Sequence, residues 1–208
     1  MFITFEGIDF CGKSTQIELL KEHLISENKK VEIIREPGGT AISEKIRELL
    51  LSKEHNEMFI EPEIFLFSAS RAQLVREKIQ PLLDEGYYVL SDRFHDSTTA
   101  YQGYGRGVDL DTVYKINYLA IDGTTPDLSF IIDIPVEVAE LRKMEKEEEQ
   151  LDRLEILDSE FFNRVREGYL IMAQQEERFK VIDGVLSIES INEKILNEVK
   201  KLEDKQLA

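Results

Sequence analysis

Short apolar runs alternate along the chain with longer stretches in which apolar residues recur at helical spacing. The short runs read as buried strands, because each is mainly apolar and is bounded by polar or turn-forming residues. They are expected at 2–5, 31–34, 87–92, 128–134 and 179–183. The chain therefore favours an α/β fold with a parallel sheet that is covered by helices on both faces.

Helical patterns fill the intervals between these runs. They are expected at 13–28, from about 41, at about 62–85, from about 136 and at about 159–178. Two further helical stretches are expected around a glycine-rich turn at 103–107. A last helix carries Ile188, Ile191, Ile195, Val199 and Leu202 on one stripe. There is no repeat, low-complexity run or Pro/Ser-rich linker, so we expect a single domain over 1–208.

Polar and glycine-rich segments follow three of the predicted strands. They are Gly7–Ser14, Arg35–Thr40 and Asp92–Arg93. Ligands of open parallel sheets bind at the carboxyl ends of the strands, so we expect a site where these segments meet.

The segment GIDFCGKS, Gly7–Ser14, has the spacing of a P-loop and lies between a strand and a helix, as that motif requires. The glycines allow successive backbone N–H groups to point at phosphate oxygens, and the helix N-terminus adds partial positive charge. Lys13 should reach the β- and γ-phosphates of a nucleotide, and Ser14 should ligate Mg²⁺. No NKxD-type guanine motif and no LSGGQ-like signature occurs, which favours a small kinase over a GTPase or a transport ATPase.

The other segments admit both a functional and a structural interpretation. Asp92, beside the P-loop if the strands are neighbours, could hold Mg²⁺ through water, and Arg93 could grip an acceptor phosphate; the alternative is a structural ion pair. Phe67 and Arg71 share a helix face and suit a planar base; the alternative is core packing plus a surface arginine. REPGGT, at 35–40, could equally be an ordinary turn.

Composition narrows the classes of partner. The formal net charge is −16, which argues against nucleic acid as a partner. No apolar window approaches about 18 residues, so no membrane span is expected. The first residues lack a basic segment and do not resemble a signal peptide. A single cysteine, Cys11, suits a reducing cytoplasm, where we expect the protein to reside.

Five segments together resemble bacterial thymidylate kinases, namely EGIDFCGKST, REPGGT, FSASR, SDRFHDSTTAYQG and LDRLE. Their order and spacing match that family, and the resemblance extends from Phe2 through the last helix. It implies a three-layer P-loop NTPase fold with a five-stranded parallel sheet and a short lid at about 141–155. It also implies phosphorylation of dTMP to dTDP with ATP and Mg²⁺ by direct in-line transfer, as a step towards dTTP.

The resemblance assigns roles residue by residue. The ATP-binding set is Gly7, Ile8, Asp9, Phe10, Cys11, Gly12, Lys13, Ser14, Thr15 and Arg142. The dTMP-binding set is Asp9, Glu36, Pro37, Arg47, Phe67, Arg71, Arg93, Ser97, Thr98, Tyr101 and Gln102. The catalytic set is Lys13, Asp9, Arg93, Asp92, Arg142 and Arg153, and the metal set is Ser14 and Asp92.

Within the dTMP set, the family uses the residues matching Phe67 to stack on thymine and Arg71 to contact its O4 edge. Thr98 and Gln102 match hydrogen-bonding partners of the base. The residue matching Tyr101 crowds the sugar 2′ position, and Asp9 matches a carboxylate that meets the 3′-hydroxyl. The attacking phosphate oxygen is largely deprotonated at neutral pH, so no strong general base is needed.

The chain departs from some family members at Phe10, where they carry a P-loop arginine. The lid is not rich in arginine either: residues 141–155 hold four basic and six acidic side chains. We therefore hypothesise that Arg142 and Arg153, its two arginines, supply most of the lid's positive charge.

Two other functions stay open on the sequence alone. One is a P-loop kinase with another acceptor, such as uridylate or a deoxynucleoside, and the other is a non-catalytic nucleotide-binding subunit. The family resemblance further implies a homodimer formed through helices packed on the sheet.

Overall fold

The computed structural model describes residues 1–145 and 151–207 and is built on one parallel sheet. The strand order is β2-β3-β1-β4-β5, and every pair of neighbours runs parallel. The strands are β1 (Phe2–Glu6), β2 (Val31–Arg35), β3 (Tyr88–Asp92), β4 (Leu128–Asp133) and β5 (Phe179–Asp183). The predicted five-stranded parallel α/β architecture is confirmed.

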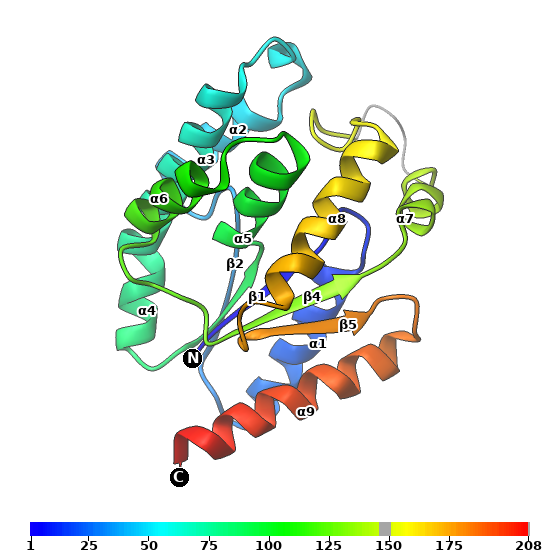
Figure 1. Ribbon diagram of the computed structural model, residues 1–208. Coiled ribbons are helices and arrows are strands. Elements are labelled where there is room, and N and C mark those ends of the chain that lie inside the picture. The colour runs from blue at the N-terminus through cyan, green and yellow to red at the C-terminus, as the bar shows by residue number, and fades with distance from the viewer. Residues whose placement is uncertain (146–150, 208) are drawn as a thin grey trace.

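Helices cover both faces of this sheet (Figure 1). Helices α1 (Lys13–Ser26) and α9 (Ile188–Leu207) pack on one face and against each other. The other face carries α3 (Ile60–Leu74), the π-helical turn η2 (Val75–Ile79), α4 (Gln80–Asp84), α5 (His95–Thr98), the π-helical segment η3 (Thr99–Gly105) and α8 (Ser159–Ala173). Helices α2 (Ala41–Leu51), α6 (Leu110–Ile121) and α7 (Val136–Lys143), with the short 3₁₀ turn η1 (Lys53–His55), complete the described elements.

Local sequence explains why the elements begin where they do. Thr40, Asp109 and Asp158 each accept a hydrogen bond from a first-turn backbone N–H at the start of α2, α6 and α8. Such side chains satisfy donors that a helix start leaves free. All residues of β1 are buried, as expected for a central strand covered on both faces.

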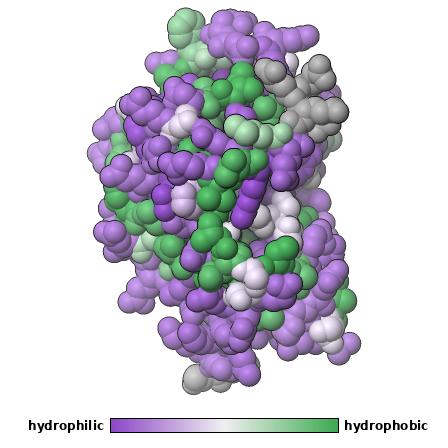
Figure 2. Space-filling model, turned by 90° about the vertical axis from the view of Figure 1, so that its right-hand side faces the viewer, coloured by the Kyte–Doolittle hydropathy of each residue, from purple (hydrophilic) through white to green (hydrophobic). Residues whose placement is uncertain are grey.

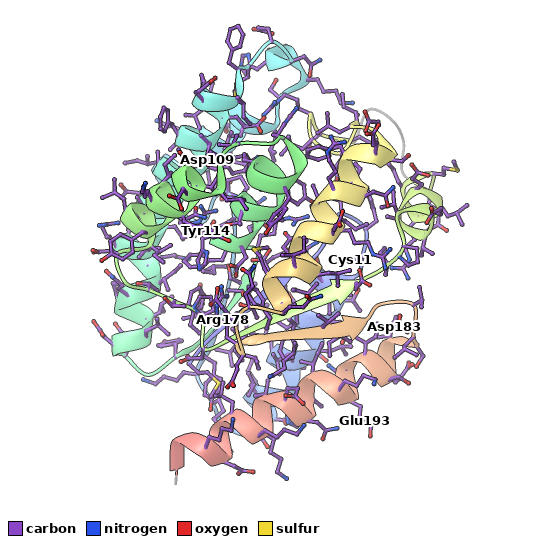
Figure 3. The ribbon with its side chains drawn as sticks, in the orientation of Figure 1. Cys11, Asp109, Tyr114, Arg178, Asp183 and Glu193 are labelled. Carbon is purple, nitrogen blue, oxygen red and sulfur yellow. The ribbon has the colours of Figure 1, made fainter. Side chains whose placement is uncertain are left out.

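Two predicted helix boundaries differ from the structure. The stretch expected at about 62–85 is helical from Ile60 to Asp84 but contains the π-helical turn η2. The helix expected to run to Arg178 ends at Ala173, because the chain turns there to enter β5. Arg178 instead lies just before β5, at the other end of the strand from Asp183 (Figure 3). It pairs with Asp96 at 2.7 Å.

The surface on the side of α7 mixes apolar and polar side chains (Figure 2). Leu141 of α7 and Met144, the residue that follows this helix, are exposed. Within residues 1–145 and 151–207, none of the helices has the length and apolar character needed to cross a membrane.

Candidate active site

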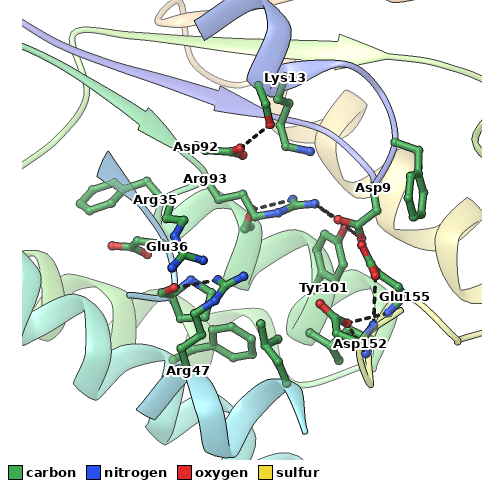
Figure 4. A pocket seen from close by; sticks show the side chains of 18 of the residues that line it. Asp9, Lys13, Arg35, Glu36, Arg47, Asp92, Arg93, Tyr101, Asp152 and Glu155 are labelled. Atoms are coloured by element: carbon green, nitrogen blue, oxygen red, sulfur yellow. Dashed lines mark hydrogen bonds and ion pairs between the residues drawn. The ribbon is translucent and has the colours of Figure 1, made fainter. Parts of the chain in front are cut away.

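A cavity of about 510 Å³ opens at the carboxyl ends of β1, β2 and β3 (Figure 4). Most of the predicted site residues line it: Asp9, Phe10, Gly12, Lys13, Ser14, Thr15, Glu36, Pro37, Arg47, Phe67, Arg71, Asp92, Arg93, Ser97, Thr98, Tyr101, Gln102 and Arg142. The predicted residues outside its lining are Gly7, Ile8, Cys11 and Arg153. The meeting of the three polar segments, expected from the sequence, is therefore observed.

The loop between β1 and α1 curls around the amine of its own lysine. Lys13 Nζ donates to the backbone oxygens of Ile8 at 3.1 Å and Gly7 at 3.4 Å. Gly7 has φ 130°, and a Cβ there would lie 2.6 Å from the carbonyl oxygen of Ile132, so only glycine fits. The result is a backbone cradle at a helix N-terminus, which suits a phosphate group.

Ile8 and Cys11 are 2% and 1% exposed and pack in the core beneath this loop. Neither side chain lines the cavity, but Cys11 Sγ lies 3.6 Å from Lys13 Nζ, and Ile8 contributes its backbone oxygen to the same amine.

Ser14 and Asp92 meet because β1 and β3 are neighbours. Phe5 pairs with Asp92 across the two strands, and Ser14 Oγ donates to Asp92 Oδ2 at 3.1 Å. A hydroxyl and a carboxylate form an all-oxygen donor set of the kind that Mg²⁺ takes together with water and phosphate oxygens. The pair fits that cation.

Arg93 forms an ion pair with Asp9 inside the cavity. Arg93 has φ 70°, and its Nη2 lies 2.6 Å from Asp9 Oδ1 and 3.0 Å from the Tyr101 hydroxyl, which in turn donates to Asp9 Oδ2 at 2.8 Å. Burial alone would raise the pKa of Asp9, but the positive charges of Arg93 and Lys13 outweigh it and hold that pKa below its usual value. Asp9 is therefore a carboxylate, and it holds the arginine at the centre of the cleft (Figure 4).

Arg71 and Glu36 form a fully buried ion pair on the β2 side of the cavity. Arg71 is 1% exposed, and its Nε donates to Glu36 Oε2 at 2.7 Å and its Nη1 to Thr98 Oγ1 at 3.0 Å. The alternative interpretation of Arg71 as a surface arginine is thus wrong. The other Glu36 oxygen, Oε1, is buried and has no hydrogen-bond partner in the described part of the chain, which leaves an acceptor available in the cleft wall.

Phe67 lies on the same face of α3 as Arg71, and both line the cavity. Arg47 enters from α2, where its Nη1 donates to the backbone oxygen of Pro37 at 2.8 Å. Burial, and then the charge of Arg35, lower the pKa of Arg47. The cleft thus presents an aromatic ring, a buried guanidinium and a further arginine along one wall.

The two lid arginines lie in different places. Arg142 Nη1 donates to the backbone oxygen of Phe10 at 3.0 Å, and its Nη2 to that of Gly184 at 3.3 Å, so it lies against the P-loop. Arg153 is 5% exposed and lies outside the cavity lining, 2.7 Å from Glu63 Oε2. The structure therefore brings only Arg142 into the cleft. The predicted lid also includes 146–150, which lie outside the described residues.

Sequence reasoning missed a buried carboxylate directly below the P-loop. Glu6, the last residue of β1, accepts from Phe94 N at 2.8 Å, Ser97 Oγ at 2.7 Å and the Tyr169 hydroxyl at 3.0 Å. Burial, and then the charge of Asp96, raise the pKa of Glu6 to about 8. The only signal in the sequence was a glutamate that ends an apolar strand just before Gly7.

Comparisons with known proteins agree over most of the chain. A sequence model of the family described as thymidylate kinase matches residues 5–195. The chain is 48% identical to the thymidylate kinase of Chlorobaculum parvum, covering 98% of this chain and 97% of that protein, and 48% identical to that of Kosmotoga olearia, covering 95% and 94%. A crystal structure of thymidylate kinase from Ehrlichia chaffeensis superposes with a TM-score of 0.77 at 35% identity, covering 96% of this chain and 98% of that one.

Proposed function

The chain belongs to the thymidylate kinase family, and from that premise we propose that it transfers the terminal phosphoryl group of ATP to dTMP, giving dTDP and ADP. One observation carries the proposal at the level of the site. The P-loop and the Phe67–Arg71 wall line the same cavity, so a nucleotide phosphate and a planar base can be held in one cleft.

The reaction needs little covalent help from the protein. A phosphate oxygen of dTMP attacks the γ-phosphorus of ATP, the bond from that phosphorus to the β–γ bridging oxygen breaks, and ADP leaves with its electron pair. Catalysis is then positioning and charge neutralisation. We assign charge neutralisation to Lys13, Arg93 and Arg142, which line the cavity.

We assign the magnesium ion of this reaction to Ser14 and Asp92, whose oxygens lie 3.1 Å apart. When bound, Mg²⁺ neutralises charge on the β- and γ-phosphates. Ser14 and Asp92 would hold the ion in place, and Asp92 would do so partly through water.

On the ATP side, we propose that the phosphates bind the backbone of Gly7–Thr15. Arg142 supports this placement because it joins the P-loop to the turn after β5. The cavity thereby offers one guanidinium from the lid region over the phosphate site. Arg153, by contrast, lies outside the lining of the cavity.

On the dTMP side, we propose that Phe67 stacks on thymine and that Arg71, Thr98 and Gln102 address its polar edge. Tyr101 would pack against C2′ of the sugar. The remaining members of this set are Asp9, Glu36, Pro37, Arg47, Arg93 and Ser97, all of which line the same cavity. The buried, unpartnered Oε1 of Glu36 supports a ligand donor at this wall.

A second copy of the chain is the partner that we propose for the outer face of α2, α3 and α6. These three helices pack side by side, and they expose large apolar side chains. The most exposed are Phe65 at 60%, Tyr118 at 77% and Leu119 at 77%. An apolar surface of this kind marks an interaction site. We also propose a cytoplasmic location and no nucleic-acid partner, in line with a formal net charge of −16.

One assay separates this function from its alternatives. ADP formation is followed with ATP, Mg²⁺ and, in turn, dTMP, UMP, CMP and thymidine. We expect kcat/KM for dTMP to exceed that for UMP by about 100-fold or more, because UMP lacks the methyl group of thymine and carries a 2′-hydroxyl where Tyr101 would pack against C2′. Equal use of UMP would indicate another acceptor, and ATP binding without turnover of any acceptor would indicate a non-catalytic subunit.

A further inference from the structure

A buried carboxylate outside the proposed chemistry joins three parts of the chain. Glu63 of α3 is 1% exposed and accepts from Gln102 Nε2 at 3.0 Å on its Oε1. Its Oε2 lies 2.7 Å from Arg153 Nη1 and 3.3 Å from Arg106 Nη2. Glu63 therefore connects α3, η3 and the end of the predicted lid at 141–155.

Arg153 is held by more than this carboxylate. Its backbone N–H donates to the carbonyl of Leu51 at 3.1 Å, and its Nε donates to that of Leu50 at 2.9 Å. These carbonyls belong to the last turn of α2, where a helix leaves acceptors free and where a cation is favoured. Arg153 thus caps α2 and pairs with α3, because its backbone N–H, Nε and Nη1 each contact an oxygen of one of these two helices.

The residues on either side of Arg153 do line the cleft. Asp152, Leu154 and Glu155 belong to its lining (Figure 4). They form a tight turn, in which Asp152 Oδ1 accepts from Leu154 N at 2.8 Å and from Glu155 N at 2.9 Å. Because the turn is stiff, the position of its cleft-facing side chains follows from where Arg153 is anchored.

We propose that Glu63 and Arg153 are positioning residues that tie the cleft wall at 152–155 to the side chain of Gln102. One Glu63 oxygen fixes the Gln102 amide, and the other fixes the anchor of the wall. Disturbing either contact displaces both features. The inference deepens the proposed function and rests on it, since Gln102 is there a partner of thymine. Arg153 then affects binding indirectly, by holding the cleft wall in place, and residues such as Arg142 supply the positive charge near the phosphates.

A double-mutant cycle tests the proposal. Arg153→Met, Glu63→Gln and the double variant are compared with wild type for kcat and for KM of dTMP and ATP separately. We expect each single change to raise KM for dTMP about tenfold and to change KM for ATP by less than about threefold. The KM for dTMP of the double variant should not exceed that of the more impaired single variant, because the effects of contacting residues are not additive. Arg153→Lys, which keeps the charge near Glu63, should recover part of the loss.

Two variants serve as references. Arg76→Met removes an arginine from a half-exposed pair with Asp122 and should leave all three constants near wild type. Arg142→Ala removes an arginine that lines the cleft and should mainly lower kcat. A fall of about 10³ in kcat for Arg153→Met with unchanged KM for dTMP would assign Arg153 to the phosphates and overturn the proposal. The proposal would also be overturned if the loss in the double variant equalled the product of the two single losses, because the two residues would then act independently.

The free energies of unfolding of wild type, Arg153→Met, Glu63→Gln and the double variant give a second measure of the coupling between Glu63 and Arg153. This measure does not depend on substrate. If Arg153→Met does not fold, the cycle is run with Arg153→Lys and Glu63→Asp. A wild-type protein that binds dTMP but does not phosphorylate it would refute the proposed function, while a measured coupling between Glu63 and Arg153 in stability and in dTMP affinity would still stand.

Discussion

Arg71 and Glu36 show how a residue that reads as a surface charge in the sequence can be part of the core. Removing one partner leaves the other charged and buried, which costs about 3–5 kcal/mol, whereas replacing both can be neutral. We therefore expect Arg71→Met to lower the free energy of unfolding by about that amount and Arg71→Met with Glu36→Leu to regain most of it. Urea denaturation measures both. Equal losses in the single and double variants would contradict this explanation.

His95 should make the protein sensitive to mild acid. Its imidazole is mostly buried, Nε2 has no hydrogen-bond partner among the described residues, and burial lowers its pKa to about 4. The folded protein keeps His95 neutral, whereas the unfolded chain takes up a proton below about pH 6.5. The stabilising contribution is thus complete above pH 6.5 and is lost as the pH falls from 6.5 to about 4.

The test compares wild type with His95→Gln between pH 7 and 4. We expect the unfolding free energy of wild type to fall more steeply, by up to about 1.4 kcal/mol per pH unit, because one extra proton binds to the unfolded state. Other titrating groups are common to both proteins and cancel. Parallel pH profiles would show that His95 titrates normally.

Asp92 is the residue through which the proposed magnesium dependence can be tested. Asp92→Asn keeps the shape and the contact with Ser14 but removes the charge. We expect apparent affinity for Mg²⁺, measured from activity against Mg²⁺ concentration, to fall by about 10–100-fold. Ser91→Ala is the matched neighbour, because Ser91 is fully buried and its hydroxyl donates to the backbone oxygen of Arg93. A normal Mg²⁺ response in Asp92→Asn would remove Asp92 from the proposed site.

At this scale, the sequence predicted the positions of those residues whose placement follows from spacing. The P-loop spacing places Lys13 and Ser14, and neighbouring strands place Asp92 beside them. Spacing does not tell on which side of a turn a side chain points, so Arg153 could not be located. Glu6 and Glu63 could not be identified either, because an isolated glutamate in a strand end or a helix usually faces solvent.

Two glycines allow η3 to approach α8 closely enough to place Tyr101 and Gln102. A Cβ at Gly168 would lie 2.6 Å from the ring of Tyr104, and one at Gly105 would lie 2.7 Å from that of Phe161. Gly168→Ala should therefore force the two segments apart, cost about 1–3 kcal/mol of stability and raise KM for dTMP.

Glu167→Ala, at the exposed neighbouring position of α8, is the control and should change neither value. Adding Tyr104→Ala to Gly168→Ala makes room for the new methyl group and should restore part of the stability. If the single Gly168→Ala variant matched wild type in thermal unfolding and in KM for dTMP, the close approach of η3 and α8 would not be needed for stability or for binding.

Element types were predicted well and element ends less well, for a physical reason. Buried strands and amphipathic helices follow from periodicity, but α8 ends where the chain must turn to bring Arg178 to Asp96. That contact joins residues far apart in the sequence. Periodicity alone cannot show it.

For the whole molecule, the apolar face of α2, α3 and α6 predicts its state of association. Tyr118→Glu with Leu119→Glu would bury two charges in the proposed interface between copies, so we expect a shift from dimer to monomer in light scattering. Leu141→Glu, on α7, changes an equally apolar residue that is 64% exposed elsewhere and should leave the mass unchanged. A wild-type protein that is monomeric at micromolar concentration would contradict the proposed dimer.

The strand order has a consequence for how such an enzyme can change over time. Because β1 lies between β3 and β4, the segments on the β2–β3 side contribute the wall that we propose for the acceptor, while α7 and the turn after β5 lie on the opposite flank. The P-loop is the narrow border between these halves. If the two nucleotides bind as proposed, mutations in α2, α3 or η3 alter the choice of acceptor without disturbing the half that would hold ATP, so that a gene duplicate could acquire a new substrate while it keeps its phosphate donor.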